Sequence, residues 1–315
     1  MKNRTYLEGF ETLQVKKNNF MKLSKILLVV LITVFFSCKT ALISQEKKEV
    51  QVVLLAGQSN MAGGGNYDNL EDYIKERIEK VADRVFISQS NTDQILLSWY
   101  KNKPSEKYDF TKRFGPELMI GLTLAEKYPN KEFLLIKHAK GGTALYGAWN
   151  PDWTLDKAKE IEKGAKKQSW NLVEQHINLI NENLAILKKK GKSYKIIGFA
   201  WMQGENDATL EKAANSYADN LEKLIKKYRT TFNVEEMPFV FGQINSRYGI
   251  KNGAKMVREQ MEKVRSAVKN VRLVKTSTDT SWSDFPKHTD NVHYNAEGQK
   301  RLGVQLAQEL IDFLK

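Results

Sequence analysis

The chain has 315 residues, a formal net charge of +13 at pH 7 and a single cysteine. One cysteine excludes an internal disulfide framework, so the fold has to be stabilised by a hydrophobic core, and the length suffices for one large domain. The charge does not indicate nucleic acid as a partner, because no base-reading module is visible and many of the lysines lie on expected helical faces. An acidic polysaccharide or an anionic membrane surface fits the charge better.

The amino-terminal part carries the pattern of an export signal. Residues 1–20 are polar, and a positively charged flank at 21–25 then precedes the apolar run 26–36, which is too short for a comfortable membrane span. Cys38 stands directly behind this run, a position that resembles a bacterial lipoprotein processing site. An incidental cysteine in an ordinary signal is the alternative. We therefore expect an envelope lipoprotein anchored through Cys38, or otherwise a secreted protein.

Three segments follow from this pattern. Residues 1–38 are predicted to be an extension with an export or lipoprotein signal, in which Met21 is a second candidate for the true start. The polar segment 39–49 is typical of a tether between a lipid anchor and a domain. Residues 50–315 are predicted to form the functional domain.

Strand-like and helical patterns alternate along this domain. Apolar runs predict strands at 52–56, 85–87, 133–137, 195–202, 239–243 and 271–275, and helical patterns lie at 116–127, 169–190, 210–231, 254–268 and 296–314. Alternation of this kind predicts an α/β fold, a three-layer α/β/α sandwich with a mainly parallel central sheet.

Ser59 follows the first predicted strand, within Gly57-Gln58-Ser59-Asn60-Met61. In open α/β sheets, ligand sites lie at the carboxyl edge of the strands, so this hydroxyl is placed where a nucleophile would be exposed. A serine is equally an ordinary turn or helix-cap residue. The interpretation as a nucleophile therefore depends on a base, an orienting carboxylate and oxyanion donors elsewhere in the chain.

Two glycine-containing segments follow later strands. Gly141-Gly142 comes after the run 133–137, and Gln203-Gly204-Glu205 comes after the run 195–202. Paired glycines let backbone N–H groups approach a substrate closely, and the Gln203 side chain supplies an NH₂ donor. Both segments could stabilise a developing oxyanion, although each taken alone could also be a turn or a helix entry.

Aromatic residues gather in two less regular stretches, 66–113 and 146–156. Both follow loops at the predicted catalytic edge of the sheet. Trp149, close behind Gly141-Gly142, is our candidate for stacking on a sugar ring. Core packing is an equally weighted alternative for any single one of these aromatic residues.

A carboxylate and an imidazole stand three residues apart near the end of the chain. This spacing lets Asp290 accept the Nδ1 proton of His293 and leaves Nε2 free to take the proton of Ser59, which is the logic of the hydrolase triad. The remaining histidines fit the role less well. They are His138, which ends a strand and could line the site, His176, which lies in a helical stretch, and His288, which has Asp284 four residues before it.

Taken in order, four segments resemble the signature of SGNH-type carbohydrate esterases. They are Gly57–Met61, Gly141–Thr143, Trp201–Glu205 and Asp290-x-x-His293. More narrowly, they resemble the sialate O-acetylesterase and acetylxylan esterase group, carbohydrate esterase family six. The resemblance covers about residues 50 to 314. It implies an SGNH-hydrolase, flavodoxin-like fold and a serine esterase that removes O-acetyl groups from sugars.

The resemblance also assigns the catalytic roles. It implies that Ser59 is the nucleophile, His293 the base and Asp290 the residue that orients the base. Glu205 is a competing candidate for the acidic member of the triad in such proteins. The local spacing to His293 favours Asp290, and we expect Glu205 to hold its loop by hydrogen bonds.

The oxyanion hole implied by the resemblance has three donors. They are the backbone N–H of Ser59, the backbone N–H of a glycine in Gly141-Gly142, with Gly142 preferred, and the side chain of Gln203. Gln203 stands where the wider superfamily commonly has asparagine and this subgroup commonly has glutamine. Gly141 and Asn60 are expected to support the site.

We expect no metal and no cofactor. The histidines show no ligand spacing, and Gly63-Gly64-Gly65 lacks the dinucleotide pattern. The expected partner is an acetylated carbohydrate such as xylan or a similar glycan, with membrane contact only through the lipid anchor. The alternatives are a sialic-acid-specific 9-O-acetylesterase, a lipase or thioesterase on the same scaffold, and a non-catalytic sugar-binding lipoprotein. The polar insertions rich in Trp and Tyr favour sugars over long acyl chains.

Overall fold

The computed structural model describes residues 49–315. The predicted signal at 1–38, the lipidation of Cys38 and all but the last residue of the tether at 39–49 lie outside the described residues. No helix between residues 49 and 315 is both long enough and apolar enough to cross a membrane.

A seven-stranded sheet forms the centre of the described chain, in the order β10-β9-β8-β1-β7-β3-β4. All neighbouring strands are parallel except β3 and β4. The six predicted strands are all present, and the predicted three-layer α/β fold with a mainly parallel sheet is confirmed. The strands are β1 (Val50–Gly57), β3 (Val85–Gln89), β4 (Ile95–Leu96), β7 (Glu132–Ala139), β8 (Tyr194–Met202), β9 (Phe239–Gly242) and β10 (Val271–Val274).

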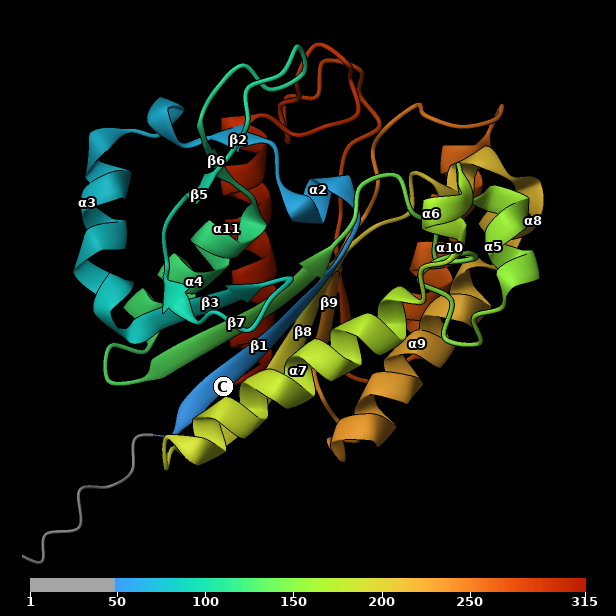
Figure 1. Cartoon of the computed structure of the whole chain (residues 1–315). Coiled ribbons are helices and arrows are strands. Elements are labelled where there is room, and N and C mark those ends of the chain that lie inside the picture. Colours follow the sequence, from blue (N-terminus) through green and yellow to red (C-terminus); the bar gives the residue numbers. More distant parts are fainter. Residues whose placement is uncertain (1–48) are drawn as a thin grey trace, which may run out of the picture. The chain divides into compact units, whose positions relative to one another are not determined.

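Helices cover both faces of this sheet (Figure 1). On one face lie α4 (Pro116–Lys127) and α11 (Ala296–Phe313), which pack against each other. On the other face lie α7 (Leu172–Lys189) and α9 (Tyr217–Phe232), and α10 (Gly253–Ala267) packs against α9 and β10. Because every strand of the parallel part is covered on both sides, β1 is buried at all eight positions.

One predicted helix is interrupted. The pattern at 210–231 predicts a single helix, whereas the structure has α8 (Glu211–Asn215), a break at Ser216, and then α9. The Ser216 hydroxyl donates a hydrogen bond to the carbonyl oxygen of Lys212 (2.8 Å). Such a bond from a serine back to the preceding turn competes with regular helix geometry, which explains the break.

The stretch 66–113 is more ordered than its sequence indicates. It holds α3 (Asp72–Val81) and two strands of a small three-stranded sheet in the order β2-β6-β5. The sequence pattern did not reveal α3, in which only Ile74, Ile78 and Val81 are buried. The other short elements are β2 (Gly65–Asn66), β5 (Tyr100–Lys101), β6 (Lys112–Phe114), α2 (Ser59–Ala62), α5 (Leu155–Ile161), α6 (Ala165–Gln168) and three 3₁₀ turns at Tyr67–Asn69, Ala82–Arg84 and Asp207–Thr209.

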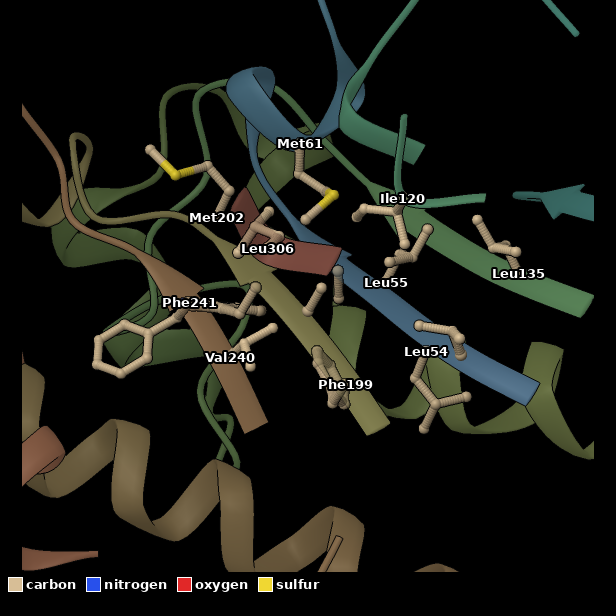
Figure 2. Packing of buried hydrophobic residues seen from close by; sticks show 14 of the residues in the cluster. Leu54, Leu55, Met61, Ile120, Leu135, Phe199, Met202, Val240, Phe241 and Leu306 are labelled. Carbon is tan, nitrogen blue, oxygen red and sulfur yellow. The ribbon is translucent and has the colours of Figure 1, made fainter. Parts of the chain in front are cut away.

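The hydrophobic core extends up to the helix that carries Ser59. Figure 2 shows Met61 of α2 above the sheet, close to Ile120 of α4 and Leu55 of β1. All three side chains are fully buried in one cluster. Met61 therefore anchors α2 in the core directly behind the end of β1, which fixes the position of the neighbouring Ser59.

Candidate active site

The turn after β1 brings Ser59 to the carboxyl edge of the sheet. Gly57 has a φ of 150°, and a Cβ atom at this position would collide with the carbonyl oxygen of Met202 on the neighbouring strand β8. Only glycine fits here, because the turn must leave the strand without a side chain between β1 and β8. Ser59 follows as the first residue of α2 and is half-buried.

Ser59, His293 and Asp290 form a continuous chain of polar contacts. Oγ of Ser59 lies 2.9 Å from Nε2 of His293, and Nδ1 of the same ring lies 2.7 Å from Oδ2 of Asp290. The other carboxylate oxygen of Asp290 accepts hydrogen bonds from the backbone N–H groups of Val292 and His293, both 2.9 Å. The structure thus brings together the three residues that the sequence singles out, and with the geometry that proton transfer from Ser59 requires.

The pKa values of Asp290 and His293 are both lowered, but for different reasons. Partial burial would raise the pKa of Asp290, but hydrogen bonds from the backbone of His293 and Val292 and from the His293 ring outweigh it and hold that pKa well below its usual range. Burial and the positive charge of Lys107 lower the pKa of His293, against the opposing effect of Asp290. Asp290 is therefore ionised and His293 neutral at pH 7, as a general base has to be.

Lys107 is an additional cation in direct contact with the base. Its Nζ lies 2.9 Å from Nδ1 and 3.2 Å from Nε2 of His293, and 3.5 Å from Oδ2 of Asp290. An ammonium group has no acceptor, so it repels an imidazolium and favours the neutral ring. Lys107 comes from the irregular stretch 66–113, and nothing in its local sequence marks it.

Glu205 contacts the turn that carries Ser59, through Gln58 and Asn60. Its Oε2 accepts a hydrogen bond from Nε2 of Gln58 and its Oε1 accepts one from Nδ2 of Asn60, both 2.7 Å. Asn60 in turn accepts a hydrogen bond from the backbone N–H of Tyr294 (3.1 Å). Burial raises the pKa of Glu205. Glu205 and Asn60 thus link the loops of Ser59 and His293, while Asp290 contacts the imidazole.

A buried ion pair fixes the other end of α2. Lys137 and Glu117 form a salt bridge of 2.6 Å in which both side chains are 1% exposed. Nζ of Lys137 also donates to the carbonyl oxygen of Ala62 (3.0 Å), which is the last residue of α2, and the hydroxyl of Tyr100 donates to the same oxygen (2.6 Å). The helix that carries Ser59 is therefore anchored at its start by Glu205 and at its end by this pair.

The glycine loop lies beside Ser59. A Cβ atom on Gly141 would be 3.5 Å from Cβ of Ser59, so the two backbones are close neighbours. Nζ of Lys167 donates to the carbonyl oxygens of Gly141 and Gly142, both 3.0 Å. Because a trans peptide places its N–H opposite its C=O, this contact turns the N–H of Gly142 away from Lys167. Gly142 has a φ of 65°, which favours glycine at this position.

The structure places the side chain of Gln203, the predicted oxyanion donor, inside the protein and not on the wall of the Ser59 cavity. Gln203 is fully buried, and its NH₂ group donates to Oδ2 of Asp207 (2.5 Å) and to the carbonyl oxygen of Thr143 (3.1 Å). Both protons are thereby committed inside the protein. Asn206, three residues further on, lines the cavity next to Ser59, and its side-chain amide donates no hydrogen bond within residues 49–315. The sequence does not distinguish Asn206 from Gln203, because the two amide side chains stand only three positions apart.

Asp207 connects this strand end to the glycine loop. Its carboxylate accepts hydrogen bonds from the backbone N–H of Leu145 (2.8 Å) and of Tyr146 (2.9 Å), besides that from Gln203. Burial raises the pKa of Asp207 to about 7. Gln203 and Asp207 therefore act on the site indirectly, by holding the segment after Gly141-Gly142 in place.

The structure also places the ring of Trp149, the predicted sugar-stacking residue, inside the protein and not on the wall of the Ser59 cavity. Trp149 is fully buried, and its ring packs edge-on against Trp201 (5.3 Å between centroids) and His138 (5.9 Å). His138 stacks on the buried His176 and does not line the Ser59 cavity. The aromatic residue that does reach this cavity is Tyr248, which is 39% exposed and lies on the loop after β9.

A cavity of about 300 Å³ opens above the triad. Its size is at the lower end of the range for small-molecule sites. Two cationic side chains, Lys107 and Lys167, line it. No group of His, Cys, Asp or Glu side chains within residues 49–315 could hold a metal ion. The lining residues are Gln58, Ser59, Lys107, Gly141, Gly142, Lys167, Glu205, Asn206, Tyr248, Val292 and His293.

Known proteins are similar to this chain in sequence. The family model described as carbohydrate esterase, sialic acid-specific acetylesterase, matches residues 49–312. A curated protein of Arabidopsis thaliana named "probable carbohydrate esterase" is 26% identical over 269 residues, which cover 82% of this chain and 89% of that protein.

Solved structures share the fold. An X-ray structure of a protein from Arabidopsis thaliana has a TM-score of 0.57 at 24% identity and covers 84% of this chain and 98% of its own. The crystal structure of NanS has a TM-score of 0.58 at 14% identity, with 85% and 98% covered. A carbohydrate acetylesterase from Xanthomonas citri has a TM-score of 0.52 at 18% identity, with 82% and 55% covered.

Proposed function

The chain belongs to the sialic acid-specific acetylesterase family of carbohydrate esterases, and from this premise we propose that it removes O-acetyl groups from a glycan with Ser59 as the nucleophile. It is a carbohydrate acetylesterase, a hydrolase of carboxylic esters. The observation that carries the proposal is the contact chain from Oγ of Ser59 to Nε2 of His293 (2.9 Å) and from Nδ1 to Asp290 (2.7 Å).

The reaction follows from this geometry in two steps. Oγ of Ser59 attacks the acetyl carbonyl carbon while Nε2 of His293 takes the hydroxyl proton, and Asp290 stabilises the imidazolium. When the tetrahedral intermediate collapses, the bond to the sugar oxygen breaks and the proton on Nε2 passes to that oxygen. A water molecule, deprotonated by His293, then attacks the acetyl-enzyme, so that acetate leaves and Ser59 regains its proton.

Three donors are available for the oxyanion. We assign this role to the backbone N–H groups of Ser59 and Gly142 and to the side-chain amide of Asn206. The support is that all three residues line the cavity, that Lys167 orients the Gly142 peptide, and that the Asn206 amide has no other partner in the described chain. Fixed donors of this kind stabilise the charge that develops on the carbonyl oxygen.

The identity of the sugar is the more specific part of the proposal. An acetylated xylan or a similar glycan fits the general activity. An acetylated sialic acid is the second candidate, and the observation that favours it is the pair of cations, Lys107 and Lys167, on the walls of the cavity. A carboxylate on the substrate would find complementary charge there. The family description points in the same direction.

We propose that the protein acts outside the cytoplasm as an envelope lipoprotein, with acetylated carbohydrate as its partner and Cys38 as the anchor. The support is the charged flank, short apolar run and Cys38 of the signal pattern. Cell fractionation tests it: the parent chain should sediment with membranes and a Cys38→Ser variant should not be lipidated. Equal membrane association of both forms, without lipid on the parent chain, would contradict this.

The activity is tested with a panel of acetylated substrates. The parent protein should release acetate from at least one of acetylxylan, acetylated sialic acids, acetylated mannan and acetylated pectin, and Ser59→Ala should reduce the rate by at least about 10³-fold. A fluorophosphonate probe should label the parent protein and not Ser59→Ala. A non-catalytic sugar-binding protein would not be labelled, and a lipase or thioesterase would prefer long acyl chains to acetyl.

A further inference from the structure

A second cavity lies behind the loop that borders the Ser59 cavity. It has a volume of about 440 Å³ and is formed by the loop after β9 and the first turn of α10. Arg247 and Gly249 line this second cavity, whereas Tyr248 between them lines the Ser59 cavity. Consecutive residues of one short loop segment therefore line the two cavities.

All charged side chains that line this second cavity are cationic. Its walls carry Arg247, Lys251, Lys255 and Arg258, and none of its lining residues is acidic. Arg258 is half-buried and donates only to neutral oxygens, those of Ile244 and Thr276. Within residues 49–315, the nearest carboxylate contact of any of these cations is the 4.0 Å pair of Lys255 with Glu259. Apart from this pair, no carboxylate of the described chain lies within 4.0 Å of these cations, so most of the positive charge of the cavity has no contacting carboxylate.

Neutral donors face the same space. Asn252 precedes α10 without capping it through its side chain, and the N–H of Gly253 donates to the carbonyl oxygen of Ile250 (2.9 Å), which leaves the N–H groups of Ala254 and Lys255, two residues that line the cavity, without a side-chain cap. Asn245 is 4% exposed and lines the cavity. Its Oδ1 accepts a hydrogen bond from the hydroxyl of Tyr294 (3.1 Å), and its Nδ2 is buried and has no partner within residues 49–315. A buried amide donor without a partner is costly unless a ligand supplies the acceptor.

An aromatic wall completes the cavity. Trp282 lines it and is 7% exposed, its Nε1 donates to Oδ1 of Asn291 (3.1 Å), and Nζ of Lys287 lies 3.6 Å from its ring centroid. Nζ of Lys287 also donates to the carbonyl oxygen of Asn245 (3.0 Å). Aromatic faces offer apolar area to the C–H face of a sugar ring, while the cations and amides offer bonds to an anion.

We propose that this second cavity binds a carboxylate-bearing sugar residue of the same glycan whose acetyl ester enters the Ser59 cavity. Its volume admits a sugar ring, its cations and free amides suit a carboxylate, and Trp282 suits the ring. The binding of the acidic sugar stands on these observations alone, and only the link to a shared glycan rests on the proposed function. Hexuronic acids and sialic acids carry the same recognised chemistry.

Nuclear magnetic resonance titration of the purified protein tests the site. D-galacturonic acid or N-acetylneuraminic acid should shift the backbone amide signals of Ala254 and Lys255, and D-galactose should not. The preferred acid identifies the source of the carboxylate. The double variant Arg247→Glu/Lys251→Glu should bind that acid at least about tenfold more weakly, because both exposed side chains then repel it. Asn245→Asp should do the same, since it keeps the acceptor for Tyr294 but replaces the free donor by a charge.

A matched control has the same change in net charge elsewhere. Lys80→Glu/Lys189→Glu alters two exposed lysines on α3 and α7 and should leave the binding of the acid unchanged. Equal weakening in the control would show a general charge effect and overturn the proposal. Inorganic phosphate that binds as tightly as the acids, or galactose that shifts the same signals, would overturn it as well, as would the absence of any shift at α10.

Kinetics test the link to the glycan separately. Arg247→Glu/Lys251→Glu should raise KM for an acidic acetylated glycan, such as acetylated pectin, and leave the hydrolysis of p-nitrophenyl acetate unchanged. A KM that does not rise overturns the shared-glycan link. If the parent protein hydrolyses no ester at all, the proposed function fails, while the titration still decides whether the second cavity binds an acidic sugar.

Discussion

Nζ of Lys107 lies against the imidazole of His293, 2.9 Å from Nδ1 and 3.2 Å from Nε2. Burial lowers the pKa of His293, and the positive charge of Lys107 in contact with the ring lowers it further, because it disfavours protonation of the imidazole. The base remains neutral in more acidic solution than a free imidazole would. We therefore expect Lys107 to extend the pH range of activity on the acidic side.

The Lys107→Met variant should move the acidic limb of the pH profile. Activity requires neutral His293 and falls as pH drops through its pKa. Removal of the charge raises this pKa, so the limb of kcat/KM against pH should shift to higher pH. Lys107→Arg keeps the charge and should keep the limb in place. A change in KM with an unmoved limb in Lys107→Met would show that Lys107 only binds substrate.

Asn206 and Gln203 should respond differently to substitution. Asn206→Ala removes an amide that lines the cavity, so kcat should fall by about 10²–10³-fold while KM and thermal stability change little. Gln203→Ala breaks buried hydrogen bonds to Thr143 and Asp207, so it should lower the free energy of unfolding by about 1–3 kcal/mol. Measured kcat values and denaturant unfolding separate the two. A larger loss of kcat in Gln203→Ala, with unchanged stability, would return the oxyanion role to Gln203.

Asp290 and Glu205 can be distinguished in the same way. Asp290→Asn should lower kcat by about 10³–10⁴-fold in a protein of nearly parental stability, because the ring of His293 loses its orienting acceptor. Glu205→Gln places an amide nitrogen opposite Gln58 or Asn60 and should mainly lower the free energy of unfolding. If Glu205→Gln gives the larger loss of kcat at unchanged stability, Glu205 and not Asp290 is the acidic member of the triad.

Two buried histidines should make the fold sensitive to acid. Burial lowers the pKa of His138 to about 4 and that of His176 to about 3. The unfolded chain takes up these protons near pH 6.5 and the folded chain does not, so this stability is present above pH 6.5 and is lost as pH falls towards 4. Each histidine contributes a slope of up to about 1.4 kcal/mol per pH unit.

Urea unfolding between pH 7 and pH 5 measures this slope. The double variant His138→Asn/His176→Gln should have a flatter dependence of the unfolding free energy on pH, whatever its stability at pH 7. His288→Gln is the control, because His288 lies in a different loop and bonds the carbonyl oxygen of Gly64. Equal slopes in the parent protein and the double variant would refute the assignment.

Most of the fold could be predicted from the sequence, because each strand of the parallel sheet is a continuous apolar run between turn residues. The same holds for Ser59, which follows such a strand, and for Asp290 and His293, whose contact is local. Lys107 could not be found, since it meets His293 across 186 positions of the chain and lies on a loop without periodicity. Such contacts depend on how loops approach each other in space.

The differences between prediction and structure at Gln203 and Trp149 have equally specific causes. Gln203 and Asn206 are both amides behind β8, and the backbone at Gly204, with a φ of 141°, decides which of them faces the cavity. A sequence does not display this angle. Trp149 belongs to a loop, but that loop folds back against Trp201 and His138, and the ring is enclosed by residues from distant strands.

Strand β1 is hydrogen-bonded along its whole length to β7 on one side and to β8 on the other. Its amides can therefore exchange with solvent only when the sheet itself opens, which is the slowest opening in such a domain. Lys107 and Tyr248 lie on surface loops, which open most easily. Ser59 thus follows directly on the strand that opens least readily, and we expect that loop grafting can exchange the side chains around the cavity without disturbing its position.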